Sequence, residues 1–196
     1  MPDIFKSMLT MTRNLAVLCA LVFAGCSSGS AVEDGKSFND ADQEFVQEMI
    51  PHHEQAVVMS EMVSNVEVSG ETAALATEII SAQASEIELM KGFLSEWGVE
   101  FDPDSDPHAS HMMGGDESHG MMTDEELAEL ENLTGSNFEK MWLTMMLAHH
   151  QGAIKMAKTA IADGKDARVK TLAEAIISQQ KKEIDLIDSL LAKLGS

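Results

Sequence analysis

The sequence predicts an all-α protein, a four-helix bundle built from two duplicated helical hairpins with a long crossover between them. The first observation behind this prediction is that the sequence aligns with itself without a gap at a shift of 97 positions, which pairs residues 45–98 with residues 142–195. The second is that apolar residues recur at three- and four-residue steps in both copies. The third is that helix-breaking residues divide each copy near its middle, so that two equivalent hairpins can pack as a bundle.

The N-terminal residues predict export. Lys6 and Arg13 precede an apolar run over residues 15–23, and this run is far shorter than the roughly 20 residues of a membrane-spanning helix. Small residues then lead to Cys26. We therefore expect residues 1–25 to be a lipoprotein signal peptide and Cys26 to be the acylated first residue of the mature chain. Ordinary secretion with cleavage nearby is the alternative.

The segment after the signal predicts a tether. Residues 26–38 are rich in Ser and Gly and are expected to link the lipid on Cys26 flexibly to the bundle. This places the protein outside the cytoplasm, anchored to a membrane at the cell envelope or on the periplasmic side. Removal of Cys19 with the signal leaves one cysteine, so no disulfide forms within the mature chain. Met11 would make a more typical start than Met1.

The bundle itself is expected over residues 39–196, with repeat units at about 40–98 and 137–195. Apolar periodicity places two helices in each unit, divided by Ser69-Gly70 in the first and by Asp163-Gly164-Lys165 in the second. The four expected helices span residues 40–66, 71–96, 137–162 and 167–194.

The crossover at residues 99–136 differs in kind from the repeat units. Pro103, Pro107 and Gly114 interrupt regular structure in its first part. Its last part begins with Thr123 and has Glu126 three places later, which is the pattern of a capping box and predicts a short additional helix.

The charge of the chain limits its partners. Asp and Glu outnumber Lys and Arg by 33 to 13, and the formal net charge is −20. Such a chain repels nucleic acid and anionic lipid headgroups, and no local cluster of Lys and Arg reverses the sign. The same charge attracts cations, but a well-solvated surface is the more general explanation, so the charge by itself only permits metal binding.

A polar layer is predicted across the middle of the bundle. His52 or His53 interrupts the apolar face of the first helix, and Gln83 and Glu86 interrupt that of the second. The midpoint of these positions falls at the hairpin turn, so antiparallel packing places them at one height. The second unit repeats the pattern with His149, His150, Gln180 and Glu183.

Two interpretations of this layer are open. Burying such groups without partners costs about 1 to 3 kcal/mol each, so that something must satisfy them. One interpretation is that imidazole and carboxylate groups satisfy each other. The other, which the duplication of both His-His pairs favours, is that the histidines bind a metal ion. Adjacent helical residues diverge by about 100°, so we expect one histidine of each pair to be a ligand and the other to lie at the edge of the cavity.

Methionine indicates which metal. The thioether is a soft ligand suited to Cu(I), and imidazole accepts copper in either oxidation state. Copper is therefore the predicted ion, with silver as a related soft ion. The alternative role of these methionines is to fill the core. The methionines that flank the His-His pairs are Met49, Met59, Met146 and Met156.

The crossover contains a second group of candidate ligands. It lies within 15 residues that contain no Leu, Ile, Val or Phe, so we do not expect these side chains to serve a core. A flexible tract rich in His and Met predicts an auxiliary metal-capture arm, and a plain loop is the alternative. The residues are His108, His111, Met112, Met113, His119, Met121 and Met122.

The paired motifs resemble those of a known family. They are Phe45-Val46-Gln47-Glu48-Met49-Ile50-Pro51-His52-His53 with Ala56 and Met59, and Trp142, Leu143 and Met146 followed by His149-His150-Gln151-Gly152-Ala153 and Met156. Over about residues 38–195 the chain resembles the domain of unknown function 305 (DUF305) family, which belongs to the ferritin-like group and includes CopM-type periplasmic copper-binding proteins. The resemblance implies a ferritin-like four-helix bundle and copper binding by the four helical histidines and the four flanking methionines.

The predicted function is to sequester copper or to pass it to a partner protein, without catalysis. The alternative is a ferritin-like di-metal (iron or manganese) oxidase or peroxidase that uses Glu86 and Glu183. That chemistry ordinarily uses Glu-x-x-His motifs and further carboxylates, whereas Met49 stands three places before His52. A zinc protease is favoured still less, because Val57 occupies the position of the second His in His-Glu-x-x-His. A third class is an interaction module whose polar layer is only structural.

Overall fold

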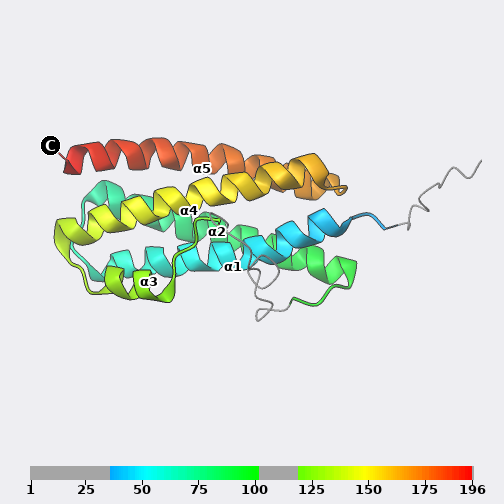
Figure 1. The fold of residues 1–196 in the computed structure, drawn as a ribbon, viewed down its shortest axis with the longest axis horizontal. Helices are drawn as coiled ribbons and strands as arrows, with labels where there is room; N and C mark the ends of the chain where they lie inside the picture. The colour runs from blue at the N-terminus through cyan, green and yellow to red at the C-terminus, as the bar shows by residue number, and fades with distance from the viewer. Residues whose placement is uncertain (1–35, 102–118, 196) are drawn as a thin grey trace, which may run out of the picture. The chain divides into compact units, whose positions relative to one another are not determined.

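A computed structural model describes residues 36–101 and 119–195 of the chain. Regular structure within these ranges is entirely helical (Figure 1), which confirms the predicted all-α class. The predicted signal peptide, the lipidation site Cys26 and most of the tether lie outside the described residues. None of the described helices is long and apolar enough to cross a membrane. The helices are α1 (Asp40–Met62), which continues into a 3-10 turn (Val63–Asn65), α2 (Gly70–Trp97), α3 (Asp124–Glu131), α4 (Gly135–Asp163) and α5 (Ala167–Leu194).

The helices repeat the duplication that the sequence shows. Helix α5 begins and ends 97 residues after α2, the same shift that aligns the two halves of the sequence. Helices α1 and α2 pack as one hairpin and α4 and α5 as the other, while α1 also packs along α4. The indole Nε1 of Trp142 donates to the carbonyl of Met59 at 3.0 Å, which fixes the height of α4 against α1. These contacts confirm the predicted bundle of two duplicated hairpins.

The helix starts are fixed by local hydrogen bonds. The side chains of Asn39 and Ser69 accept from backbone N–H groups of the first turns of α1 and α2, and that of Asp166 does the same for α5. Thr123 and Glu126 form the predicted capping box at the start of α3. Each cap satisfies a backbone donor that has no partner inside the helix.

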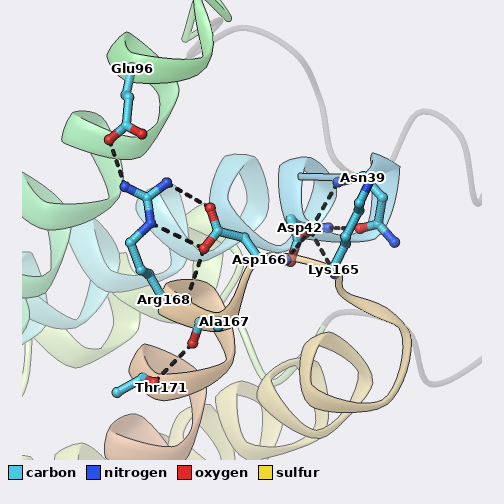
Figure 2. A network of polar contacts seen from close by, with 8 residues as sticks. All are labelled: Asn39, Asp42, Glu96, Lys165, Asp166, Ala167, Arg168 and Thr171. Carbon is cyan, nitrogen blue, oxygen red and sulfur yellow. Dashed lines mark hydrogen bonds and ion pairs between the residues drawn. The ribbon is translucent and has the colours of Figure 1, made fainter. Parts of the chain in front are cut away.

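Two buried carboxylates join the hairpins to each other. Asp42 of α1 accepts the backbone N–H groups of Lys165 and Asp166, at 2.8 and 3.0 Å, where α5 begins (Figure 2). Glu139 of α4 stands 97 residues later and accepts from the backbone N–H of Ser69 at 3.2 Å. It also accepts from the hydroxyl of Thr72 at the start of α2. The first helix of each hairpin therefore holds the start of the second helix of the other hairpin.

The core consists of two apolar clusters with the polar layer between them. The first cluster takes residues 45–50 of α1, 87–94 of α2, 153–160 of α4 and 169–176 of α5. The second takes residues 56–63, 75–79, 138–146 and 187–190 of the same helices, together with Leu130 of α3. Along every one of the four long helices, the stretch between the two clusters contains two of the predicted polar residues. They are His52, His53, Gln83, Glu86, His149, His150, Gln180 and Glu183.

Candidate metal centre

The two halves of the molecule meet at a pair of histidines. The imidazole rings of His52 on α1 and His149 on α4 lie with their centroids 3.7 Å apart. All four helical histidines are at most 1 % exposed. Neither member of either pair therefore faces solvent, and which member of each pair would be a ligand stays a prediction. Helix α1 is covered on one side by α4, which buries His52, and on another by α2, which buries His53.

Each hairpin also holds an imidazole–carboxylate pair. Nε2 of His53 lies 2.8 Å from Oε2 of Glu86, and Nε2 of His150 lies 2.6 Å from Oε2 of Glu183. This confirms that the polar residues of the two helices share one height. It also shows that mutual satisfaction of imidazole and carboxylate accounts for one nitrogen of His53 and one of His150.

Other polar atoms of the layer have no hydrogen-bond partner among the described residues. Because carboxylate and carbonyl oxygens only accept, Nε2 of His52, His53 and His150 carries the proton in the neutral ring, and the lone pair lies on Nδ1. A histidine that donates one N–H to an oxygen and keeps its other nitrogen open is the usual arrangement of a metal ligand. The unpartnered atoms are Nδ1 of all four histidines, Nε2 of His149, and both carboxamide atoms of Gln83 and Gln180.

Burial keeps the central pair neutral. The pKa of His52 is lowered from an ordinary value of 6.5 to about 3, mainly by burial and next by the charge that His53 would carry. Burial also lowers the pKa of His149 well below its ordinary value, with the neighbouring His52 as the next cause. Both rings are thus unprotonated at neutral pH, which is the form that binds metal.

The four predicted methionines lie on either side of the layer. Met49 and Met156 belong to the first apolar cluster, and Met59 and Met146 belong to the second. Met49 and Met146 precede His52 and His149 by three residues, so each stands on the same helix face one turn away. All four are buried, which suits core packing as well as a thioether ligand set.

The donor set of the layer is mixed. Among the described residues, no group of three or more His, Cys, Asp or Glu side chains is arranged to hold a metal ion. An ion at this level would therefore combine imidazole nitrogen with thioether sulfur or carboxamide oxygen. Such a set suits a soft or borderline ion more than a hard one.

The crossover candidates divide into two groups. His108, His111, Met112 and Met113 lie outside the described residues. Residues 119–122 are described, and they lie against α1 and α4. The side chain of Met122 packs against the second apolar cluster, so the expectation that these residues do not serve a core is wrong for Met122. The short helix α3 follows directly after these residues and precedes α4.

Sequence reasoning missed the groups that hold residues 119–122. The carbonyl of His119 accepts from Nε2 of His52 at 3.0 Å. Gln55 donates to the carbonyl of Met122 at 2.8 Å and accepts from its N–H at 2.7 Å. Gly152 of α4 lies beneath the same segment. The sequence did contain a sign of this contact. Gln55 and Gly152 occupy equivalent positions in the two repeats but are different residues, which sets this position apart from the matching histidines nearby.

Comparisons with known proteins agree with this architecture. Residues 42–191 match the family described as Domain of unknown function (DUF305). A solved DUF305 protein from Streptomyces coelicolor, described as secreted, is 34% identical with a TM-score of 0.70, covering 80% of this chain and 94% of that one. A DUF305 fragment from Deinococcus radiodurans is 27% identical with a TM-score of 0.71, covering 81% and 99%.

Two further relatives are informative. CopM in its Cu(II)-bound form is 27% identical with a TM-score of 0.64, covering 78% of this chain and 96% of CopM. It has also been solved in Cu(I)-bound and Ag-bound forms. The uncharacterized protein L153 of Acanthamoeba polyphaga mimivirus is 42% identical over 53 residues, and the match spans about a third of its length (35%) and 27% of this chain. Because the family match runs from α1 into α5 and includes both histidine pairs, the chain belongs to the DUF305 family.

Proposed function

We propose that this protein binds copper outside the cytoplasm, at the polar layer between its two hairpins, and that it sequesters the ion or passes it on. The observation that carries the proposal is the facing pair His52 and His149, whose rings are buried, neutral and 3.7 Å apart. Their Nδ1 atoms have no partner among the described residues. Buried polar atoms of this kind are costly unless a ligand satisfies them.

The chemistry of the surrounding groups supports copper. Neutral imidazole binds copper in both oxidation states, and thioether sulfur favours Cu(I) and the similar Ag(I). The similarity to CopM, which has been solved with Cu(II), Cu(I) and Ag, supports the same class of ion at 25–27% identity. In this proposal Met49 and Met146 supply sulfur next to the central pair, and Met59 and Met156 supply it from farther along the helices.

The remaining polar residues of the layer have supporting roles. Glu86 and Glu183 orient His53 and His150 by accepting a hydrogen bond from Nε2–H, which leaves Nδ1 to face a ligand. Gln83 and Gln180 offer carboxamide oxygens that have no partner among the described residues. The di-metal oxidase alternative needs Glu86 and Glu183 as bridging ligands, yet each is engaged by a histidine of its own hairpin.

The location of the protein is part of the proposal. The relative from Streptomyces coelicolor is described as secreted, and the N-terminal pattern predicts acylation of Cys26. We propose that the lipid on Cys26 holds the bundle at the outer face of a membrane, where copper from outside the cytoplasm reaches it.

A titration with Cu(I) against a competing chelator tests the proposal. We compare the purified protein with the double variant His52→Ala/His149→Ala and with His108→Ala/His111→Ala in the crossover. Loss of binding in the first variant, with retention in the second, supports the layer as the site. Equal loss in both would assign binding to the crossover, and no uptake by the unmodified protein would overturn the proposal. Iron uptake with oxygen consumption would favour the oxidase.

The methionines need a separate comparison. Met49→Leu/Met146→Leu keeps the volume of the core but removes sulfur beside the layer, and Met145→Leu is the matched control from the second cluster. We expect the double variant to weaken Cu(I) binding about tenfold or more while the control does not. Equal affinities would limit these methionines to packing.

A further inference from the structure

The last part of the crossover covers the central histidine pair. Residues 119–122, which we call the latch, pass over α1 and α4 at the level of His52 and His149. The carbonyl of His119 accepts from Nε2 of His52 at 3.0 Å. At the other end of the latch, the backbone of Met122 exchanges two hydrogen bonds with the side chain of Gln55. Both ends are thus fastened to α1.

The surface of α4 is shaped to receive the latch. A Cβ atom on Gly152 would collide with the carbonyl of His119, and one on Gly120 would collide with the carbonyl of Ala148. The backbone of His119 adopts a φ of 46°, and Gly120 adopts 75°, both in the left-handed region that non-glycine residues seldom occupy. The close approach therefore depends on glycine on each side of the contact.

The latch determines which nitrogen of His52 is open. A backbone carbonyl only accepts, so it holds the proton of His52 on Nε2 and leaves the lone pair on Nδ1. His149, the equivalent residue of the second half, makes no hydrogen bond to the latch, and the backbone group that acts on its ring belongs to His52. The latch thus makes the two facing histidines chemically different.

A surface cavity lies beside the latch. It has a volume of about 190 Å³ and is lined in part by His119, by Met156 and by Glu44 and Glu48 of α1. His119 is therefore both the first residue of the latch and part of the cavity wall. Movement of the latch would bring solvent from this cavity to the His52 and His149 pair.

The geometry points to the latch as a positioning and sealing element of the layer. Closed, it holds His52 in the Nε2–H tautomer and separates the pair from solvent. Copper enters and leaves the layer when the latch lifts, so the latch sets the rate of exchange. The part that concerns exchange rests on the proposed copper function, whereas the tautomer of His52 is a property of the metal-free protein.

Two variants and one control test the inference. Gly152→Ala places a methyl group where the His119 carbonyl lies. Gln55→Met keeps the side-chain length but removes both hydrogen bonds to Met122, and it serves if Gly152→Ala does not fold. Gly92→Ala is the matched control, because a Cβ on this helical glycine has nothing within 4 Å. The imidazole nitrogens of the metal-free proteins are observed by ¹⁵N NMR, with the His52 signals assigned from His52→Gln.

We expect the Nε2–H tautomer at His52 in the unmodified protein and in Gly92→Ala, and a mixture of tautomers in both latch variants. Transfer of bound Cu(I) to a chelator should be about tenfold faster in the latch variants, because Gln55→Met removes two partly buried hydrogen bonds and Gly152→Ala displaces the His119 carbonyl. An Nδ1–H tautomer in the unmodified protein, or the same tautomer in all proteins, would overturn the inference. Absence of Cu(I) uptake would instead contradict the proposed function and leave the tautomer result standing.

Discussion

At the residue scale, the proposed metal binding depends on His52 and His149. Their rings face each other across the interface of α1 and α4, and burial holds both in the neutral form. In the folded protein, an imidazole that stays neutral retains a lone pair for a ligand. In the unfolded chain, the same imidazole takes up a proton in mild acid. The same burial that prepares the site therefore makes folding sensitive to pH.

We expect the metal-free protein to lose stability as the pH falls below about 6.5. The pKa of His52 is lowered from 6.5 to about 3 in the folded protein. Below pH 6.5 the unfolded chain therefore takes up a proton that the folded protein does not, and the free energy of unfolding falls progressively down to about pH 3. The loss is about 1 kcal/mol per pH unit for each such histidine. Urea unfolding at several pH values measures it. The acidic residues titrate equally in the unmodified protein and in His52→Gln. The free energy of unfolding of His52→Gln should therefore fall less steeply with decreasing pH, and parallel curves for the two proteins would contradict the account.

Glu86 tests the role of the imidazole–carboxylate pairs. Glu86→Gln removes the charge that holds the proton on Nε2 of His53, and we expect Cu(I) affinity to fall about 10- to 100-fold. Glu88→Gln, on the exposed side of the same helix, is the matched control and should bind normally. Competition with a Cu(I) chelator gives the dissociation constants of both variants. Equal affinities for the two variants would show that the pair is only structural.

At the scale of elements, the hairpins depend on each other through the duplicated carboxylates. Asp42 accepts three backbone N–H groups, from Asn39, Lys165 and Asp166. Its equivalent Glu139 serves the start of α2. Burial acts to raise the pKa of Glu139, but the hydrogen bonds from Ser69 and Thr72 together outweigh it and lower the pKa below its ordinary value. The backbone N–H groups just before the second helix of each hairpin are held by a carboxylate of the other hairpin, so the two are expected to fold together.

Asp42→Ala should destabilise the bundle by about 2 to 3 kcal/mol, because it leaves buried N–H groups without an acceptor. Asp40→Ala, an exposed acidic residue of the same helical turn, is the control and should change stability little. Chemical denaturation followed by circular dichroism measures both free energies of unfolding. Similar values for the two variants would show that Asp42 does not clamp α5.

The sequence predicts these elements unevenly, for physical reasons. The helix spans follow from apolar periodicity, and the height of the polar layer follows from the hairpin turns, because both depend on spacing along one chain. The partner of each polar group depends on side-chain direction, which is why His53 meets Glu86 and His52 meets a carbonyl from the crossover. The Asp42 and Glu139 clamps were missed because the duplicated position keeps a carboxylate but not the same residue.

At the scale of the whole molecule, the polar layer is the boundary between two otherwise apolar cores. Each half contributes the same set of residues, so the duplication places two His-His motifs in one layer. The net charge of −20 favours the approach of cations to the molecule. A cation that binds the folded layer and not the unfolded chain also stabilises the bundle.

Anomalous X-ray diffraction at the copper edge, from crystals of the copper-loaded protein, tests this account most directly. We predict a peak between α1 and α4, beside His52 and His149 and within reach of the sulfur of Met49 or Met146. Copper only among the crossover histidines, or a polar layer that stays empty of copper at full loading, would contradict it.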